Sequence, residues 1–184
     1  LEGLRQPLEA GHILISRARG NLTLPSKFTL VAAMNPCPCG YAGDEEKACR
    51  CAAYEIIKYQ KKISGPLLDR IDLQITVPRL SYDELHAPTP ERASADALRG
   101  QVARARGEQK KRLAAMDKLT NAELSSKECD RLLSPTPRAA AFLKNAFRQS
   151  LLSARGYYRV LKVAQTICDL EGAPQLDEPH IAEA

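Results

Sequence analysis

Four cysteines lie in two close pairs, and this arrangement is typical of metal ligands. Cys37 and Cys39 flank a proline, and Cys49 and Cys51 flank an arginine ten residues later. Four thiolates match a tetrahedral zinc site in number, although Cys-x-Cys departs from the usual Cys-x₂-Cys spacing. The alternatives are reduced free thiols or a disulfide formed on oxidation. Because no nearby side chain indicates an open coordination position, we predict structural rather than catalytic zinc.

Asn35 follows a short apolar run, Phe28–Met34, which is typical of a strand buried on both faces of a parallel sheet. Ligands of open α/β sheets bind beyond the carboxyl ends of the strands. An amide at that place can orient a water molecule or contact a phosphate. Position alone favours the simpler interpretation, in which Asn35 only starts the turn before Pro36.

Arg70 stands where a short helical turn, begun at Ser64, meets the alternating segment Ile71–Val77, which we predict to be a strand ended by Pro78. An arginine at such a junction can reach a phosphate on a neighbouring subunit. The alternative is a local ion pair with Asp69 or Asp72, which would be favoured for an isolated arginine.

Arg155 follows Ser153, a predicted N-cap, and therefore falls in the first turn of a helix. A cation there opposes the helix dipole, whereas an anion is favoured. Arg159 and Lys162 continue the same basic stripe at helical spacing. The stripe indicates contact with a polyanion; the alternative is a solvated helix face.

The elements that must position these groups form a mostly helical α/β chain. Alternating segments on either side of Gly20, His12–Ser16 and Asn21–Leu24, predict a β-hairpin. Helices are predicted at residues 52–63, 91–116, 137–151 and 153–170, and a further helix begins near residue 179. The Pro-rich segment Ala87–Pro90 is the predicted linker between a domain at 1–86 and a domain at 87–184.

The composition is that of an ordinary globular protein, with 184 residues, 44% apolar and 27% charged. These values exclude disordered, collagen-like and coiled-coil classes, and no apolar stretch is long enough to span a membrane. We expect a cytoplasmic protein with reduced thiols, in which Cys129 and Cys168 are core residues. The absence of an initiator Met before Leu1 suggests part of a longer protein. The net charge of +5 does not by itself prove nucleic-acid binding.

Four blocks occur in one order: 1–9, 31–40, 64–72 and 153–156. With these blocks the sequence resembles the magnesium-chelatase-like AAA+ family, specifically the competence-associated branch with a Lon-protease-like N-terminal domain. The resemblance implies the C-terminal half of an AAA+ core in residues 1–86, with sheet strands, an inserted hairpin and a Cys-rich loop. It implies a helical lid domain in residues 87–184.

The resemblance also implies roles for single residues. Asn35 corresponds to sensor 1, which positions the attacking water, and Arg70 to the arginine finger, which acts in trans. Arg155 corresponds to sensor 2, which contacts the ATP phosphates. The hairpin would point into the pore of a ring, expected to be a hexamer, where Arg17 and Arg19 would contact DNA. ATP and Mg²⁺ are the implied cofactors. The paired cysteines also resemble a feature of the family, but the resemblance does not identify their metal, so Zn²⁺ rests on the number of ligands alone.

One departure from the family is large. The sequence contains no Gly-x₄-Gly-Lys-Ser/Thr phosphate loop and no strand ending in adjacent acids, both of which we expect before Leu1. We therefore predict that this chain alone neither binds ATP tightly nor hydrolyses it. The whole protein is expected to couple ATP hydrolysis to DNA translocation or branch migration in recombination. The alternatives are a motor subunit for metal insertion into porphyrin and a non-catalytic, zinc-stabilised nucleic-acid-binding module.

Overall fold

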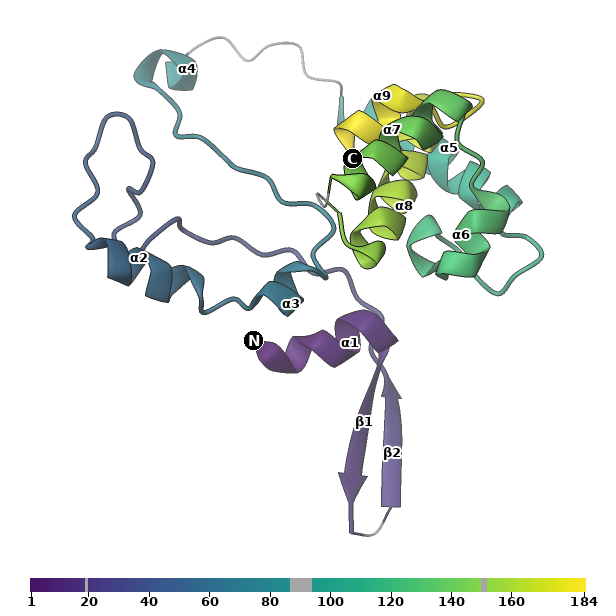
Figure 1. Cartoon of the computed structure of the whole chain (residues 1–184), viewed down its shortest axis with the longest axis horizontal. Helices are drawn as coiled ribbons and strands as arrows, with labels where there is room; N and C mark the ends of the chain where they lie inside the picture. Colours follow the sequence, from purple (N-terminus) through teal and green to yellow (C-terminus); the bar gives the residue numbers. More distant parts are fainter. Residues whose placement is uncertain (19, 87–93, 150–151) are drawn as a thin grey trace. The chain divides into compact units, whose positions relative to one another are not determined.

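The computed structural model describes residues 1–18, 20–86, 94–149 and 152–184. The chain divides into two compact units, Leu1–His86 and Ala87–Ala184, coloured purple to blue and teal to yellow in Figure 1. The described residues are mostly helical and contain one small antiparallel sheet, so the predicted class is confirmed. No helix among the described residues is long and apolar enough to cross a membrane.

The first unit opens with a 3₁₀ turn, Glu2–Leu4, that continues into helix α1, Arg5–Ala10. Pro7 lies in the first turn of α1, where a missing backbone N–H costs little. The helix ends at Gly11, whose φ of 66° is the left-handed conformation that glycine adopts without a steric penalty. The chain then leaves α1 directly into a strand.

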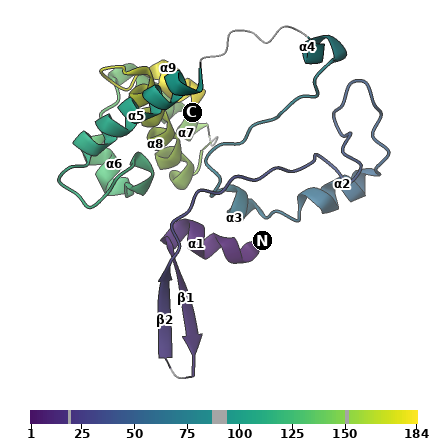
Figure 2. The same cartoon turned by 180° about the vertical axis from the view of Figure 1, so that it is seen from behind.

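The predicted hairpin is confirmed. Strand β1, His12–Arg17, pairs with β2, Gly20–Pro25, so that Ile13 faces Leu24 and Arg17 faces Gly20. Figure 2 shows the hairpin extending from the end of α1 as a separate arm of the first unit. Every described residue of the two strands is exposed except Ile15, which is half-buried.

Two predicted strands are wrong. Residues 28–34 and 71–77 are extended but carry no strand hydrogen bonds, and the sheet in the described part of the chain consists of β1 and β2 alone. A segment becomes a strand only when a neighbour pairs with its backbone groups, and the apolar pattern supplies no such neighbour. Val31 is 90% exposed, so the predicted burial of residues 28–34 on both faces is also wrong. Val77, at the end of the second segment, is 84% exposed.

Three short helices complete the first unit: α2 at Ala53–Gln60, α3 at Gly65–Leu68 and α4 at Tyr82–His86. The backbone N–H of Ala52 donates to the Glu55 carboxylate at 2.9 Å, which caps α2. The Ser64 hydroxyl accepts from the backbone N–H of Leu67 and caps α3. Helices α2 and α3 therefore begin where the sequence predicts, after Ala52 and Ser64.

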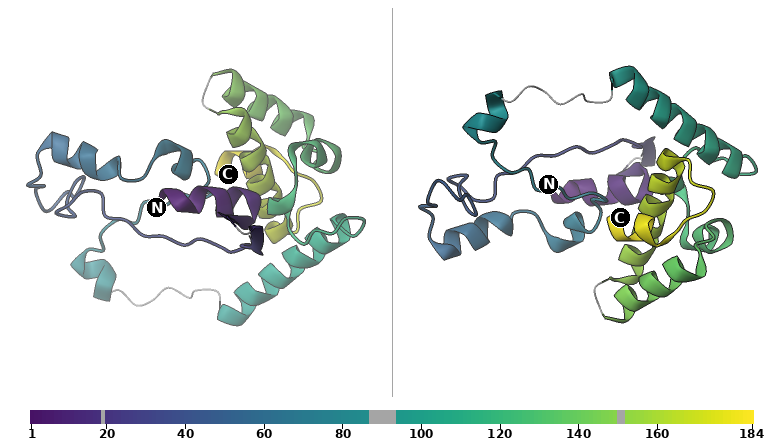
Figure 3. Two further views of the ribbon diagram at one scale, coloured as in Figure 1. Left: turned by 90° about the horizontal axis from the view of Figure 1, so that it is seen from below. Right: turned by 90° about the horizontal axis from the view of Figure 1, so that it is seen from above.

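The second unit is a helical bundle. Its elements are α5 at Ala95–Arg112, a 3₁₀ turn at Asn121–Glu123, α6 at Ser126–Leu132, α7 at Pro137–Arg148, α8 at Ala154–Glu171 and α9 at Glu178–Glu183. Helix α8 packs against α5, α6, α7 and α9, and Figure 3 shows the bundle from below and above. The core includes Leu113, Leu143 and Leu161. Cys129 and Cys168 are buried in it, as predicted.

A buried polar network joins α5 to α8. Asp169 is 5% exposed and accepts hydrogen bonds from both Nη atoms of Arg112, at 2.5 and 3.0 Å. Asn121 and Gln165 donate to the same carboxylate at 2.9 and 3.0 Å. Burial raises the pKa of Asp169, but these hydrogen bonds outweigh it and lower the pKa overall.

Candidate functional site

The four cysteines of the predicted zinc site converge. Their sulfur atoms all lie within 4.8 Å of one another. The Sγ atoms of Cys37 and Cys39 are 3.4 Å apart, and Cys49 Sγ lies 3.7 and 3.6 Å from them. A tetrahedral zinc ion with Zn–S bonds of about 2.3 Å requires sulfur–sulfur separations of about 3.8 Å. The cluster is therefore compatible with zinc.

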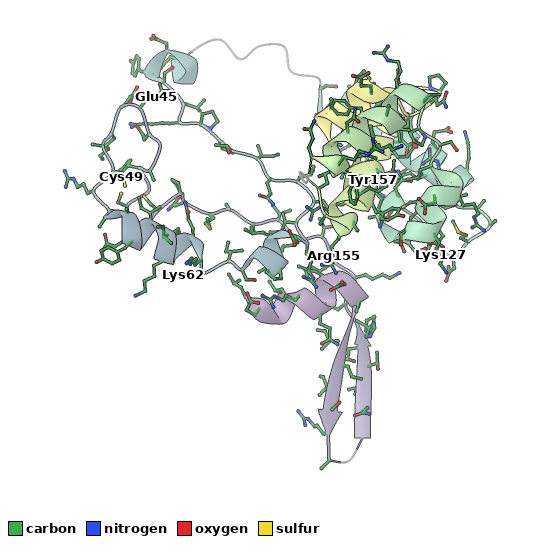
Figure 4. All side chains as sticks on the ribbon, in the orientation of Figure 1. Glu45, Cys49, Lys62, Lys127, Arg155 and Tyr157 are labelled. Carbon is green, nitrogen blue, oxygen red and sulfur yellow. The ribbon has the colours of Figure 1, made fainter. Side chains whose placement is uncertain are left out.

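Tight turns bring the two pairs together. Gly40 and Gly43 adopt φ values of 86° and 83°, which side chains beyond glycine rarely tolerate. The Asp44 carboxylate accepts from the backbone N–H groups of Glu46 and Lys47 at 2.9 and 2.8 Å, which folds the chain back toward the second pair. Figure 4 shows Cys49 in the loop that leads into α2.

Backbone groups around the cluster favour thiolates. The N–H groups of Arg50 and Tyr41 donate to the sulfur of Cys39 and lower its pKa to about 6. Burial raises the pKa of Cys37, but hydrogen bonds that include the N–H of Ala42 lower it overall. The thiols of Cys37 and Cys39 therefore lose their protons more readily than ordinary cysteine thiols do.

The other two thiols show the opposite trend. The backbone N–H of Cys39 lowers the pKa of Cys51, but burial and the neighbouring thiols raise it to about 12. The backbone N–H of Cys51 lowers the pKa of Cys49, but burial and the thiols of Cys39 and Cys37 raise it overall. Four close thiolates repel one another, and a divalent cation at their centre removes that repulsion.

Asn35 is exposed in an extended segment two residues before Cys37. Because residues 28–34 form no strand among the described residues, the predicted placement of Asn35 at the end of a sheet strand is not observed. The adjacent residue Pro36 is held to α2, because its carbonyl accepts from Gln60 Nε2 at 3.3 Å. The sensor 1 role of Asn35 stays a prediction.

Arg70 is mostly buried within the first unit, with 15% of its side chain exposed. Its guanidinium donates to the Glu9 carboxylate of α1 and to the carbonyl of Pro66. The sequence offered a local ion pair with Asp69 or Asp72 as the alternative to a role in trans, and it did not predict the pair with Glu9. No local signal could have identified Glu9, because it lies 61 residues earlier in the chain. A role for Arg70 in trans stays a prediction.

Arg155 lies in the first turn of α8, as the sequence predicted, and belongs to the second unit. Ser153 is the N-cap, and its hydroxyl accepts from the backbone N–H of Gly156 at 3.0 Å. Arg155 is exposed (Figure 4). Farther along the predicted basic stripe, Lys162 Nζ donates to the carbonyl of Ala122 at 3.1 Å, so part of the stripe supports the bundle itself.

Arg17, the first predicted DNA contact, is the last residue of β1 and is exposed. It therefore stands at the far end of the hairpin arm. Arg19, the second predicted contact, lies outside the described residues.

Comparison with known proteins decides the family. Residues 1–85 match the family model for magnesium chelatase, subunit ChlI, and residues 92–184 match the model for the C-terminal part of that subunit. The chain belongs to the magnesium chelatase family. The resemblance of the sequence blocks is thereby confirmed at the level of the family.

Relatives within the magnesium chelatase family match the chain along its length. The chain is 42% identical to competence protein ComM of Haemophilus influenzae, over 100% of the chain and 35% of that protein. It is 41% identical to the uncharacterized protein Rv2897c of Mycobacterium tuberculosis, over 97% of the chain and 35% of that protein. YifB of Escherichia coli, also uncharacterized, is 36% identical over 100% of the chain. The chain spans about a third of the length of these relatives.

Proposed function

We propose that this chain is part of a ring-forming AAA+ ATPase that couples ATP hydrolysis to movement along DNA during recombination of incoming DNA. The family match and the 42% identity with a relative named as a competence protein support this proposal. The structural observation that carries it is the hairpin β1–β2, an exposed arm with a cation at its end.

The hairpin suits contact with a nucleic acid in the pore of a ring. A two-stranded hairpin is marginally stable in water by itself, and this one exposes apolar side chains, with Leu14 47% and Leu22 55% exposed. Packing beside the hairpins of neighbouring subunits would cover these side chains. Arg17 would then face the DNA backbone, where arginine contacts phosphate without reading sequence.

The nucleotide pocket is proposed to be completed by the rest of the protein. The chain contains no phosphate loop, and its relatives are about three times as long. The exposed apolar segments 28–34 and 71–77 would pair with strands supplied by that remainder. Asn35 would then orient the attacking water beside the γ-phosphate of Mg²⁺-bound ATP, and Arg155 would contact the phosphates from the lid.

Arg70 is the proposed arginine finger for the nucleotide of a neighbouring subunit. A finger stabilises negative charge that develops on the transferred phosphoryl group and accelerates hydrolysis by roughly 10³–10⁵-fold. Glu9 holds the guanidinium in the described unit. In the ring, the proposal requires the phosphate to bind the guanidinium beside Glu9, which keeps its contact with Arg70.

Replacement of Arg70 tests this function in the full-length protein. Arg70→Ala should lower the ATPase rate of the assembled ring by roughly 10³-fold or more. Arg138→Ala is a matched control, because Arg138 is an exposed arginine paired only at the surface with Glu178. A ring that hydrolyses ATP at the unaltered rate after Arg70→Ala would contradict the finger role.

A second candidate function follows from the descriptions of both family models. The whole protein would be a motor subunit that drives insertion of magnesium into a porphyrin. Measuring the ATPase rate of the full-length protein with and without DNA separates the two functions. Stimulation by DNA supports the DNA motor, and stimulation only by a porphyrin-binding partner supports the chelatase.

A further inference from the structure

The loop that carries the cysteines has almost no apolar core. Of the described residues in the first unit, only Pro7, Cys37 and Leu67 are buried. Cys37 is 0% exposed and is the sole buried side chain between residues 36 and 64. Small protein segments without a hydrophobic core usually depend on a disulfide or a metal ion for stability. Some other interaction must therefore hold residues 36–51 in this conformation.

The sulfur positions favour one ion at the centre. All four Sγ atoms lie within 4.8 Å, which leaves room for a single tetrahedral metal. In a [4Fe–4S] cluster each cysteine binds a different iron, so the four sulfurs would stand farther apart than this. Soft thiolate ligands in a tetrahedral S₄ arrangement select zinc, or a single iron, over magnesium and calcium.

We propose that Cys37, Cys39, Cys49 and Cys51 bind one structural zinc ion that stabilises the segment from Pro36 to the end of α2. With four protein ligands the site is closed, as in structural zinc sites, and it leaves no position for a substrate. Backbone N–H groups of Tyr41, Ala42 and Arg50 point to the sulfurs and supply the outer hydrogen bonds that metal-bound thiolates require.

The zinc ion would also position the residues on either side of the loop. Cys51 lies two residues before the first residue of α2, and Cys37 lies two residues after Asn35. Gln60, at the end of α2, donates to the carbonyl of Pro36, so a hydrogen bond joins the two ends of the segment 36–60. The positioning of Asn35 matters for catalysis only if the proposed ATPase function holds. The stability effect is independent of that function.

The first experiment measures metal in the chain itself. The 184-residue chain is purified without chelator and its metal content is determined by mass spectrometry. We expect about one zinc per chain, and intense visible absorption of a tetrahedral thiolate site when Co²⁺ replaces Zn²⁺. Well under one metal per chain, even after incubation with Zn²⁺ under reducing conditions, would overturn the proposal. One iron in place of zinc would overturn the choice of metal.

The second experiment compares two cysteine substitutions. Cys49→Ser should reduce bound zinc severalfold, whereas Cys129→Ala should leave it unchanged, because Cys129 lies in the core of the second unit. Hydrogen exchange read by mass spectrometry should show loss of protection in residues 36–63 after Cys49→Ser or chelation. Protection of α5–α9 should remain. Unchanged exchange in residues 36–63 after complete zinc removal would overturn the stabilising role. Neither experiment involves ATP or DNA, so failure here leaves the proposed motor function standing.

Discussion

Glu9 holds Arg70 across the first unit, although 61 residues separate them in the sequence. The contact ties α1 to the turn that follows α3, because Arg70 also donates to the carbonyl of Pro66. A guanidinium held by both a carboxylate and a carbonyl has a defined direction. Glu9 therefore determines where the proposed arginine finger points.

Glu9→Gln should weaken the first unit slightly and misdirect Arg70. The Glu9 side chain is 48% exposed, so loss of its charge should cost less than about 1 kcal/mol. In the full-length ring, ATP hydrolysis should fall while ATP binding stays unchanged, since Glu9 is proposed only to orient Arg70. The measurements are nucleotide titration and the ATPase rate. A loss confined to ATP binding would argue against orientation as the role.

Arg112→Met should strongly destabilise the second unit. The substitution leaves the buried carboxylate of Asp169 without its cation, and breaking a buried pair in this way costs about 3–5 kcal/mol. Adding Asp169→Leu should restore much of the lost stability, because no unpaired charge is then buried. Urea unfolding of the chain measures both variants. Arg99→Ala, which removes an exposed pair with Asp96, is the control and should have little effect.

Glu128 should contribute stability that is lost in acid. Its hydrogen bonds from Lys118 and from Ser125 lower its pKa from 4.5 to about 2. A carboxyl whose pKa is lower in the folded state stabilises the fold above its unfolded pKa, and the contribution disappears as pH falls through the folded value. Unfolding midpoints of the parent chain and Glu128→Gln should therefore differ most above pH 4.5 and converge toward pH 2. A constant difference across that range would contradict the pairing.

Arg17→Ala should weaken DNA binding by the full-length protein without changing its ATPase rate in the absence of DNA. If Arg17 contacts one phosphate at each hairpin, the slope of the logarithm of the binding constant against the logarithm of the salt concentration should decrease in magnitude by about one per contact. Fluorescence anisotropy with duplex and single-stranded DNA at several salt concentrations provides the measurement. Ser16→Ala, on the same strand, is the matched control. Equal DNA affinity for Arg17→Ala and Ser16→Ala would contradict the proposal that the end of the hairpin contacts DNA.

Local features of this protein could be predicted from the sequence. The hairpin around Gly20 and the N-cap Ser153 both depend on a few neighbouring residues. The cysteine spacing belongs to the same class, because tight turns at Gly40 and Gly43 help to bring the two pairs together. In each case the conformation of a short segment decides the outcome.

Contacts between distant segments were decided only by the tertiary structure. The apolar patterns at 28–34 and 71–77 resemble strands, yet pairing depends on a neighbouring strand that the pattern does not specify. Nothing near Arg70 or Arg112 identifies Glu9 or Asp169 as its partner. The Arg112–Asp169 pair forms because α5 packs against α8, and that packing follows from burial of helix faces rather than from any local motif.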